Sequence, residues 1–212
     1  MGMRVHSLAV GATAAAVLIA GCSSGLTPKP SAGSSGPPAS PPVAGKTLPY
    51  AGAPKVEKPL PESALSGHPC DGALTSSQIN EIFRMQPRGV HADIPALGAE
   101  CKWVNEDTGA LVQVLYTTKS DGLSAVYANT RGLAKVWRPL PSVQGLPAVA
   151  HTTSSDSGKQ DNCQVSVGVT GKYTADVSVG LGQTRVGSQD PCDAAATVAD
   201  MVIANLKHKA GA

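Results

Sequence analysis

The stretch that decides the fold is Cys163-Gln-Val-Ser-Val-Gly-Val-Thr-Gly-Lys-Tyr-Thr-Ala-Asp-Val-Ser-Val-Gly-Leu181. Its valines alternate with small or polar residues on both sides of a central Thr-Gly-Lys turn. Alternation with period two is typical of a strand that buries one face. The pattern predicts a β-hairpin with strands over 164–169 and 173–181, whose valines face a common core.

A long amphipathic helix is predicted directly after this hairpin. Asp190 is placed to cap it, Pro191 suits its first position, and Asp193 adds an acidic residue to its first turn. Apolar residues then recur every three or four positions up to Leu206. One face of this helix should therefore pack on the sheet.

Two further helices and three further strands complete the prediction. Thr75 and Gln78 form a capping box for a short helix that ends before Pro87. Apolar residues at helical spacing predict a second helix over 122–137, ended by Pro139. Strands are expected over 101–105, 110–117 and 143–152, the last of them broken by Gly145 and Pro147. Because hairpins connect the strands, the predicted fold class is α+β, with an antiparallel sheet of about five strands, about three helices packed on it, and two disulfides.

The first 21 residues of the 212-residue chain are typical of an export signal. Arg4 precedes an apolar run from Leu8 to Ala20, which is too short to span a bilayer as a helix. The run ends in Ile19-Ala20-Gly21-Cys22, which matches the bacterial lipobox. We therefore expect N-acyl and S-diacylglycerol groups on Cys22 that hold the protein on the outer face of the cytoplasmic membrane. The alternative is an ordinary secretory leader with a chance cysteine.

Composition divides the remaining chain into a tether and a domain. Residues 23–67 include eight Ser, six Gly and ten Pro, too few apolar residues to form a core. We expect a disordered tether over 22–67, one domain over 68–207, and a tail over 208–212. The domain is long enough for a single core. A polar loop over 152–162 has no predicted role.

Four cysteines remain for the domain. An even number in an exported chain favours disulfides, and three pairings are possible. Cys70 and Cys192 each precede a helix, whereas Cys101 and Cys163 each open a strand. We therefore favour Cys70–Cys101 and Cys163–Cys192, each joining a helix entry to a strand start. A zinc site is the competing reading, but no Cys-x-x-Cys pair is present.

Charge and motifs exclude several classes of function. The formal net charge is +2, which gives no electrostatic basis for binding nucleic acid. The sequence has no Gly-x-Ser-x-Gly, His-Glu-x-x-His or Ser-x-x-Lys catalytic motif with its companions, so we expect no enzyme, no cofactor and no metal. His68, His91 and His151 lack the spacing of metal ligands.

A few residues have a functional alternative to a structural reading. His91 and Asp93, near Arg88, could form an acid–base pair, although scattered polar residues on a loop are the ordinary interpretation. Aspartates could suggest calcium, but they lack the alternation of a calcium loop. Both tryptophans are expected in the core. The aspartates in question are Asp156, Asp161 and Asp176, and the tryptophans are Trp103 and Trp137.

The cysteine motifs, taken together with the lipobox, resemble a known family. Pro69-Cys70-Asp71, Cys101-Lys-Trp103, Cys163-x-Val165 and Asp190-Pro191-Cys192 occur in this order after a Ser/Pro-rich spacer. This set resembles the LprB-like family of mycobacterial and other actinobacterial envelope lipoproteins, whose function is unknown. The resemblance implies an envelope lipoprotein with two disulfides and an α+β domain, and it implies no catalytic residues.

These features predict a membrane-anchored, non-enzymatic binding or sensor module outside the cytoplasmic membrane. Its partner would be an unknown envelope protein or lipid. A carrier of lipid or another small ligand is the first alternative. An enzyme that processes wall or lipid, with site residues scattered in sequence, is the second.

Overall fold

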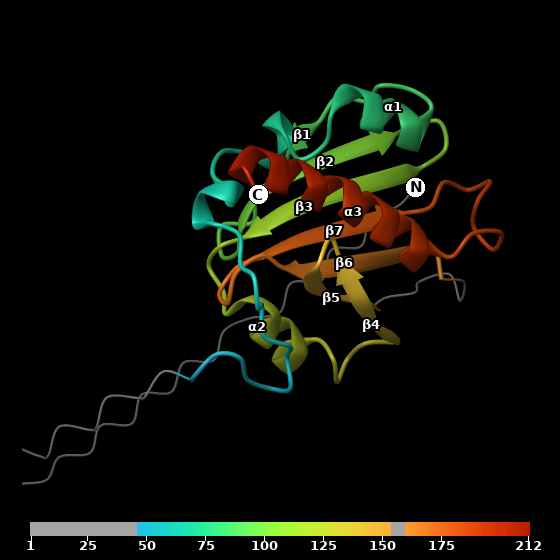
Figure 1. Cartoon of the computed structure of the whole chain (residues 1–212). Helices are drawn as coiled ribbons and strands as arrows, with labels where there is room; N and C mark the ends of the chain where they lie inside the picture. The colour runs from blue at the N-terminus through green and yellow to red at the C-terminus, as the bar shows by residue number, and fades with distance from the viewer. Residues whose placement is uncertain (1–45, 154–159) are drawn as a thin grey trace, which may run out of the picture. The chain divides into compact units, whose positions relative to one another are not determined.

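The computed structural model describes residues 46–153 and 160–212 (Figure 1). Helices in this part are η1 Glu62–Leu65 and η2 Pro69–Asp71, which are short 3-10 turns, and α1 Ser76–Phe83, α2 Gly122–Asn129 and α3 Pro191–Ala210. Strands are β1 Val90–His91, β2 Gly98–Asn105, β3 Ala110–Thr117, β4 Val136–Val143, β5 Leu146–Thr152, β6 Asn162–Gly168 and β7 Thr174–Gly180.

All seven strands form one antiparallel sheet in the order β1-β2-β3-β7-β6-β5-β4. The α+β class is therefore confirmed, but the sheet has seven strands rather than about five. β3 pairs with β7 near the middle, so strands far apart in the sequence share the centre of the sheet. The two unpredicted strands, β1 and β4, occupy the two edges.

The predicted hairpin is present as β6 and β7. Val165 pairs with Val177 and Val167 pairs with Ala175, and all four side chains are fully buried. The predicted C-terminal helix is also confirmed, since Asp190 caps α3 by accepting hydrogen bonds from the backbone N–H groups of Cys192 and Asp193. α3 lies across β6 and β7 in Figure 1.

The second predicted helix is only half right. α2 ends at Asn129, and the segment after it forms a turn and then β4, which includes Trp137, Pro139 and Pro141. Proline cannot donate to a β ladder but is tolerated on an edge strand. β4 has this edge position, so Trp137, which also fitted the helical spacing, lies in a strand instead.

The break predicted at Gly145 in the strand over 143–152 is confirmed as a turn, whereas the break predicted at Pro147 is wrong. Gln144 and Gly145 both have positive φ, at 51° and 80°, as the tight turn of a two-residue hairpin requires. This turn joins β4 to β5, and β5 continues through Pro147 to Thr152.

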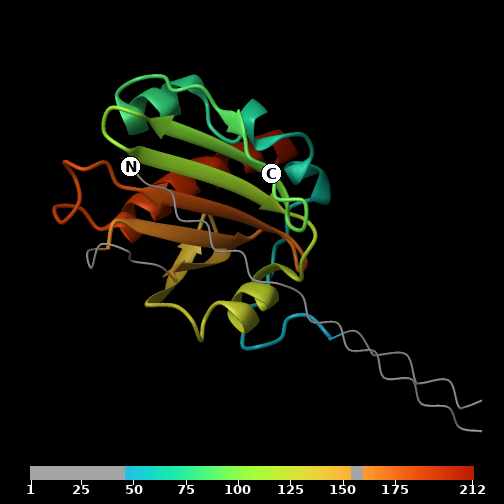
Figure 2. The same cartoon turned by 180° about the vertical axis from the view of Figure 1, so that it is seen from behind.

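The two faces of the sheet are covered differently. α3, α1 and the 3-10 turns cover one face, where the core is dominated by valines of β3, β6 and β7. α2 packs on part of the other face through Leu123 and Tyr127, against Val149. Figure 2 shows this second face, on which no described helix lies in front of β2 and β3.

The boundary between tether and domain lies further toward the N-terminus than predicted. Residues 46–67 lie along the domain: Leu60 donates a backbone hydrogen bond to Val169, and Ala53, Ala64 and Leu65 are buried. The prolines of this segment leave it without long helices or strands, yet its few apolar residues still contact the core. At the other end, α3 continues to Ala210, beyond the predicted domain limit at 207.

Candidate functional site

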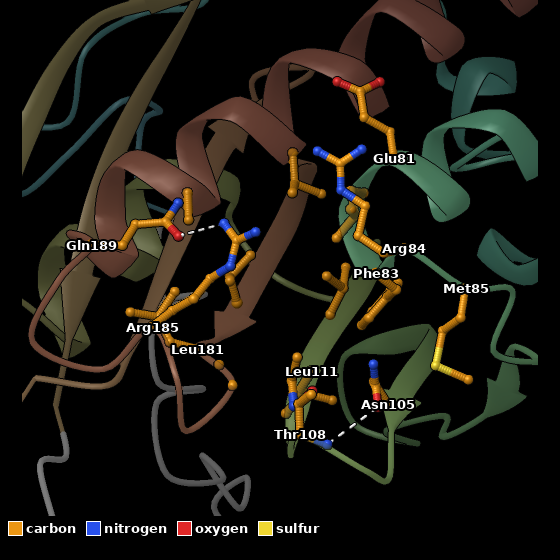
Figure 3. A pocket seen from close by; sticks show the side chains of 18 of the residues that line it. Glu81, Phe83, Arg84, Met85, Asn105, Thr108, Leu111, Leu181, Arg185 and Gln189 are labelled. Atoms are coloured by element: carbon orange, nitrogen blue, oxygen red, sulfur yellow. Dashed lines mark hydrogen bonds between the residues drawn. The ribbon is translucent and has the colours of Figure 1, made fainter.

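A groove of about 680 Å³ opens between the end of α1 and the first half of α3 (Figure 3). The turn between β2 and β3 and the segment between β7 and α3 complete its walls. Pockets that bind small molecules commonly have volumes of about 300–1,000 Å³. The groove is therefore large enough for such a ligand.

The groove exists because the two helices differ in length. α1 has 8 residues and α3 has 20, which correspond to about 12 Å and about 30 Å of helix. Asn205 of α3 ties the two together at the start of α1, where its side-chain amide donates to the Ala73 carbonyl at 3.0 Å and to Gln78 Oε1 at 2.8 Å. The first half of α3 extends beyond α1, and the sheet beneath is left open there.

Apolar side chains dominate the floor of the groove. Phe83, at the end of α1, is 6% exposed, and Val112 and Val179 contribute from the sheet. The apolar lining residues, from four separate elements and their connections, are Ile82, Phe83, Met85, Ala110, Leu111, Val112, Val179, Leu181, Ala194, Val198 and Met201. The floor would accept an aliphatic or aromatic group.

Two guanidinium groups stand at the rim of this floor. Arg84 ends α1 in the left-handed conformation (φ 59°), and Arg185 comes from the opposite wall, where it donates to Gln189 Oε1 at 3.0 Å (Figure 3). Within the described ranges 46–153 and 160–212, neither guanidinium lies within 4.0 Å of a carboxylate oxygen. Glu81 and Asp107 also line the groove. Both arginines are thus available to an anionic group.

The four domain cysteines form two disulfides. Cys70 is joined to Cys101 and Cys163 to Cys192, with Cα–Cα distances of 5.0 and 4.9 Å. These are the pairs that the sequence favoured. The predicted lipid-bearing Cys22 lies outside the described residues.

The suggested His91–Asp93 pair is replaced by a different arrangement. His68 Nε2 lies 2.8 Å from Asp93 Oδ1, while the Cys70 backbone N–H donates to His68 Nδ1 at 3.1 Å. His91 stacks on His68 with ring centroids 3.5 Å apart. The backbone N–H of Glu100 and then the His68 hydrogen bond lower the pKa of Asp93. Asp93 therefore joins its own loop to β2 and to the segment before η2.

The same cluster brings potential metal ligands together. Ligand atoms of His68, Cys70 and His91 lie within 4.8 Å of one another. However, the Cys70 sulfur is held in a disulfide and cannot act as a thiolate, and the Nδ1 lone pair of His68 already accepts a backbone hydrogen bond. The residues as bonded here do not fit a metal ion.

The remaining candidates are scattered. Trp103 is confirmed in the core at 1% exposure, whereas Trp137 is half-buried on β4 and packs edge-on against Tyr127. Asp176 lies on β7, on the opposite face of the sheet from the groove, and Asp161 is at the start of β6, so these aspartates share no site. Asp156 lies outside the described residues.

Sequence reasoning missed the groove entirely. Its residues come from segments 81–85, 105–112, 179–189 and 194–201, and no local motif links them. Arg84 and Arg185 looked like ordinary surface residues. In the part of the chain that the structure describes, no helix is both long enough and apolar enough to cross a membrane.

The fold and the site define a class of protein: a disulfide-linked α+β domain with an open, apolar-floored groove. The chain belongs to a family described as protein of unknown function (DUF3558), whose profile matches residues 17–205. No curated protein and no solved structure shows significant similarity to it.

Proposed function

We propose that the protein is a membrane-anchored binding module of the actinobacterial, LprB-like envelope lipoproteins. The lipobox at Cys22 would provide the anchor, and the Pro/Ser/Gly-rich segment before residue 46 would hold the domain away from the bilayer. The two disulfides support a location outside the cytoplasm, because such bonds persist in oxidising compartments.

The ligand is an amphipathic anion, an acyl chain with a carboxylate or phosphate group. The observation that carries this proposal is the apolar floor of the groove beneath two guanidinium groups that, within the described residues, have no carboxylate partner. Arginine donates paired hydrogen bonds that match the oxygens of carboxylates and phosphates. The acyl chain would lie on Phe83, Leu111 and Met201, and the anionic group would face Arg84 and Arg185.

The lining of the groove favours binding over catalysis. Its described residues include no histidine, cysteine, serine or lysine, and the hydroxyls of Thr108 and Thr197 form hydrogen bonds with backbone atoms rather than with Glu81 or Asp107. The same groove would serve the alternative function, a lipid carrier, which differs from a sensor only in releasing its ligand to an acceptor.

The test uses the full chain, purified from its own envelope and examined by native mass spectrometry for retained lipid. The chain is then incubated with palmitate that bears a photoactivatable diazirine, and the labelled peptides are identified. We expect labels in segments 82–85, 110–112 and 194–201. A glycerophospholipid bearing the same diazirine distinguishes a free fatty acid from a phosphate headgroup.

Charge variants provide the matched comparison. Arg84→Gln together with Arg185→Gln should weaken palmitate binding about tenfold, which is 1.4 kcal/mol for two exposed ion pairs. Arg131→Gln with Lys172→Gln removes two exposed cations outside the groove and should leave binding unchanged. Labels spread over the surface, or binding insensitive to both pairs, would refute the proposal. Saturable binding of an acidic peptide in the absence of lipid would overturn the proposed lipid ligand in favour of a peptide ligand.

A further inference from the structure

A second pocket, of about 490 Å³, lies on the opposite face of the sheet from the groove. Strands β2, β3, β7, β6 and β5 form its floor, and α2 and the turn over 94–97 form its walls. Its walls are largely apolar, with Ile94, Leu97, Ala125 and Val126. Its floor is polar, in contrast to the groove.

The register of the sheet explains the polar floor. Residues directly opposite each other in neighbouring antiparallel strands project from the same face. Asp176 of β7 pairs with Leu115 on one side and Ser166 on the other, and Leu115 pairs in turn with Glu100. The adjacent row, one pleat along, consists of Gln113, Ser178, Gln164 and His151, with Lys102 of β2 opposite Gln113 at its outer end.

Asp176 is the unusual member of this floor. It is 5% exposed, and its Oδ2 atom accepts hydrogen bonds from Thr117 Oγ1 at 2.5 Å and Thr174 Oγ1 at 2.8 Å. Its Oδ1 atom is buried without a hydrogen-bond partner. Burying a carboxylate oxygen unpaired is costly, so such atoms are rare unless a ligand uses them.

The other polar side chains of the floor bond to each other. Gln113 Nε2 donates to Glu100 Oε1 at 2.6 Å, and Ser178 Oγ donates to Gln164 Oε1 at 3.3 Å. His151 Nε2 lies 3.1 Å from Ser166 Oγ. Among the described residues of the floor, Asp176 is the one with a buried side-chain oxygen that has no hydrogen-bond partner.

The charges of the pocket select the chemistry of its ligand. Its described lining includes two carboxylates, Glu100 and Asp176, and no lysine or arginine. Burial lowers the pKa of His151, so this ring is neutral at pH 7 and does not offset them. Lys102 lies close enough to act on Glu100 but is not part of the lining. A ligand should therefore be a cation that donates hydrogen bonds.

We propose that this pocket binds a small aliphatic molecule with a primary ammonium group, and that the Asp176 carboxylate is its counter-ion. The hydroxyls of Thr117 and Thr174 donate to Oδ2 of the carboxylate, and the ammonium group would donate to Oδ1. Ile94, Leu97 and Val126 contact the aliphatic part. This site lies on the opposite face of the sheet from the groove and does not depend on the function proposed for the groove.

The experiment is a calorimetric titration of the full chain with n-pentylamine and with 1-pentanol. The two probes have the same aliphatic length, but the alcohol carries no charge. We expect saturable binding of the amine and at least tenfold weaker binding of the alcohol. Asp176→Asn should weaken amine binding at least tenfold, whereas Glu106→Gln, which removes an exposed carboxylate from the turn between β2 and β3, should not change it.

If Asp176→Asn fails to fold, the site can still be located in the parent chain by measuring its backbone amide chemical shifts. Addition of pentylamine should shift the amide signals of Thr117, Asp176 and Ser178, with smaller changes on α3. Equal affinity for amine and alcohol would overturn the proposal. Shifts confined to other surfaces, or no saturable amine binding at millimolar concentrations, would do the same.

Discussion

Replacing either pair of disulfide cysteines by alanine should cost nearly the same stability. In the chain-entropy model, a disulfide stabilises a protein by restricting the unfolded chain, to an extent set by the length of the loop that it closes. The two loops span 31 residues for Cys70–Cys101 and 29 residues for Cys163–Cys192. These lengths give about 3.7 and about 3.6 kcal/mol at 25 °C.

The two effects should also add. The loops occupy separate stretches of the chain and neither encloses the other, so removing both disulfides should cost about 7 kcal/mol. That is a large share of the roughly 5–15 kcal/mol by which a typical domain is stable. Alanine is preferred to serine because Cys101, Cys163 and Cys192 are at most 2% exposed, and alanine adds no polar group at these buried positions.

Urea unfolding of the full chain, followed by the fluorescence of buried Trp103, measures the effect. With a slope of about 2 kcal/mol per molar urea, each pair of substitutions should lower the midpoint by about 1.8 M. The reduced parent serves as a control, because it should match the variant with all four alanines. A cost below about 1 kcal/mol for either pair, or a combined cost far from the sum, would refute the loop-entropy reasoning.

Three other substitutions test separate parts of the structure. Burial raises the pKa of Glu100, so the charged carboxylate is less favourable in the folded chain than in the unfolded chain. Glu100→Gln should therefore raise the urea midpoint at pH 7, and this gain should vanish as the pH falls to about 4. Gly98→Ala should lower the free energy of unfolding by about 1–3 kcal/mol or more, since φ is +157° and a Cβ atom would lie 2.0 Å from the Tyr116 carbonyl oxygen. Gly109→Ala, with open space around the residue, should lower it by less. Asn205→Ala removes both hydrogen bonds that tie α3 to the start of α1, so it should lower the free energy of unfolding by about 1–2 kcal/mol. An unchanged urea midpoint would contradict the role of Asn205 in joining these two helices.

The parts of the fold that local physics determines were predictable. Period-two valines specify β6 and β7 because each strand buries one face whatever lies elsewhere in the chain. Thr75 and Asp190 mark helix starts because a capping side chain acts within three residues of itself. The disulfide pairs followed from the position of each cysteine beside such an element.

The parts that depend on distant contacts were not predictable. β4 is a strand because β5 offers it a pairing edge, although Trp137 near its start also suited the end of a helix. The segment 46–67 contacts the domain through a few apolar residues that its average composition conceals. Neither the groove nor the unpaired Asp176 has a local signature, because each arises from the order in which the strands assemble.

Both margins of the sheet are poor templates for another chain. β1 has two residues, and β4 carries Pro139 and Pro141, which interrupt the row of backbone donors that an added strand would need. Open strand edges invite aggregation when a protein is concentrated, because an added strand can pair with them. This sheet offers little of either edge to another copy of the chain.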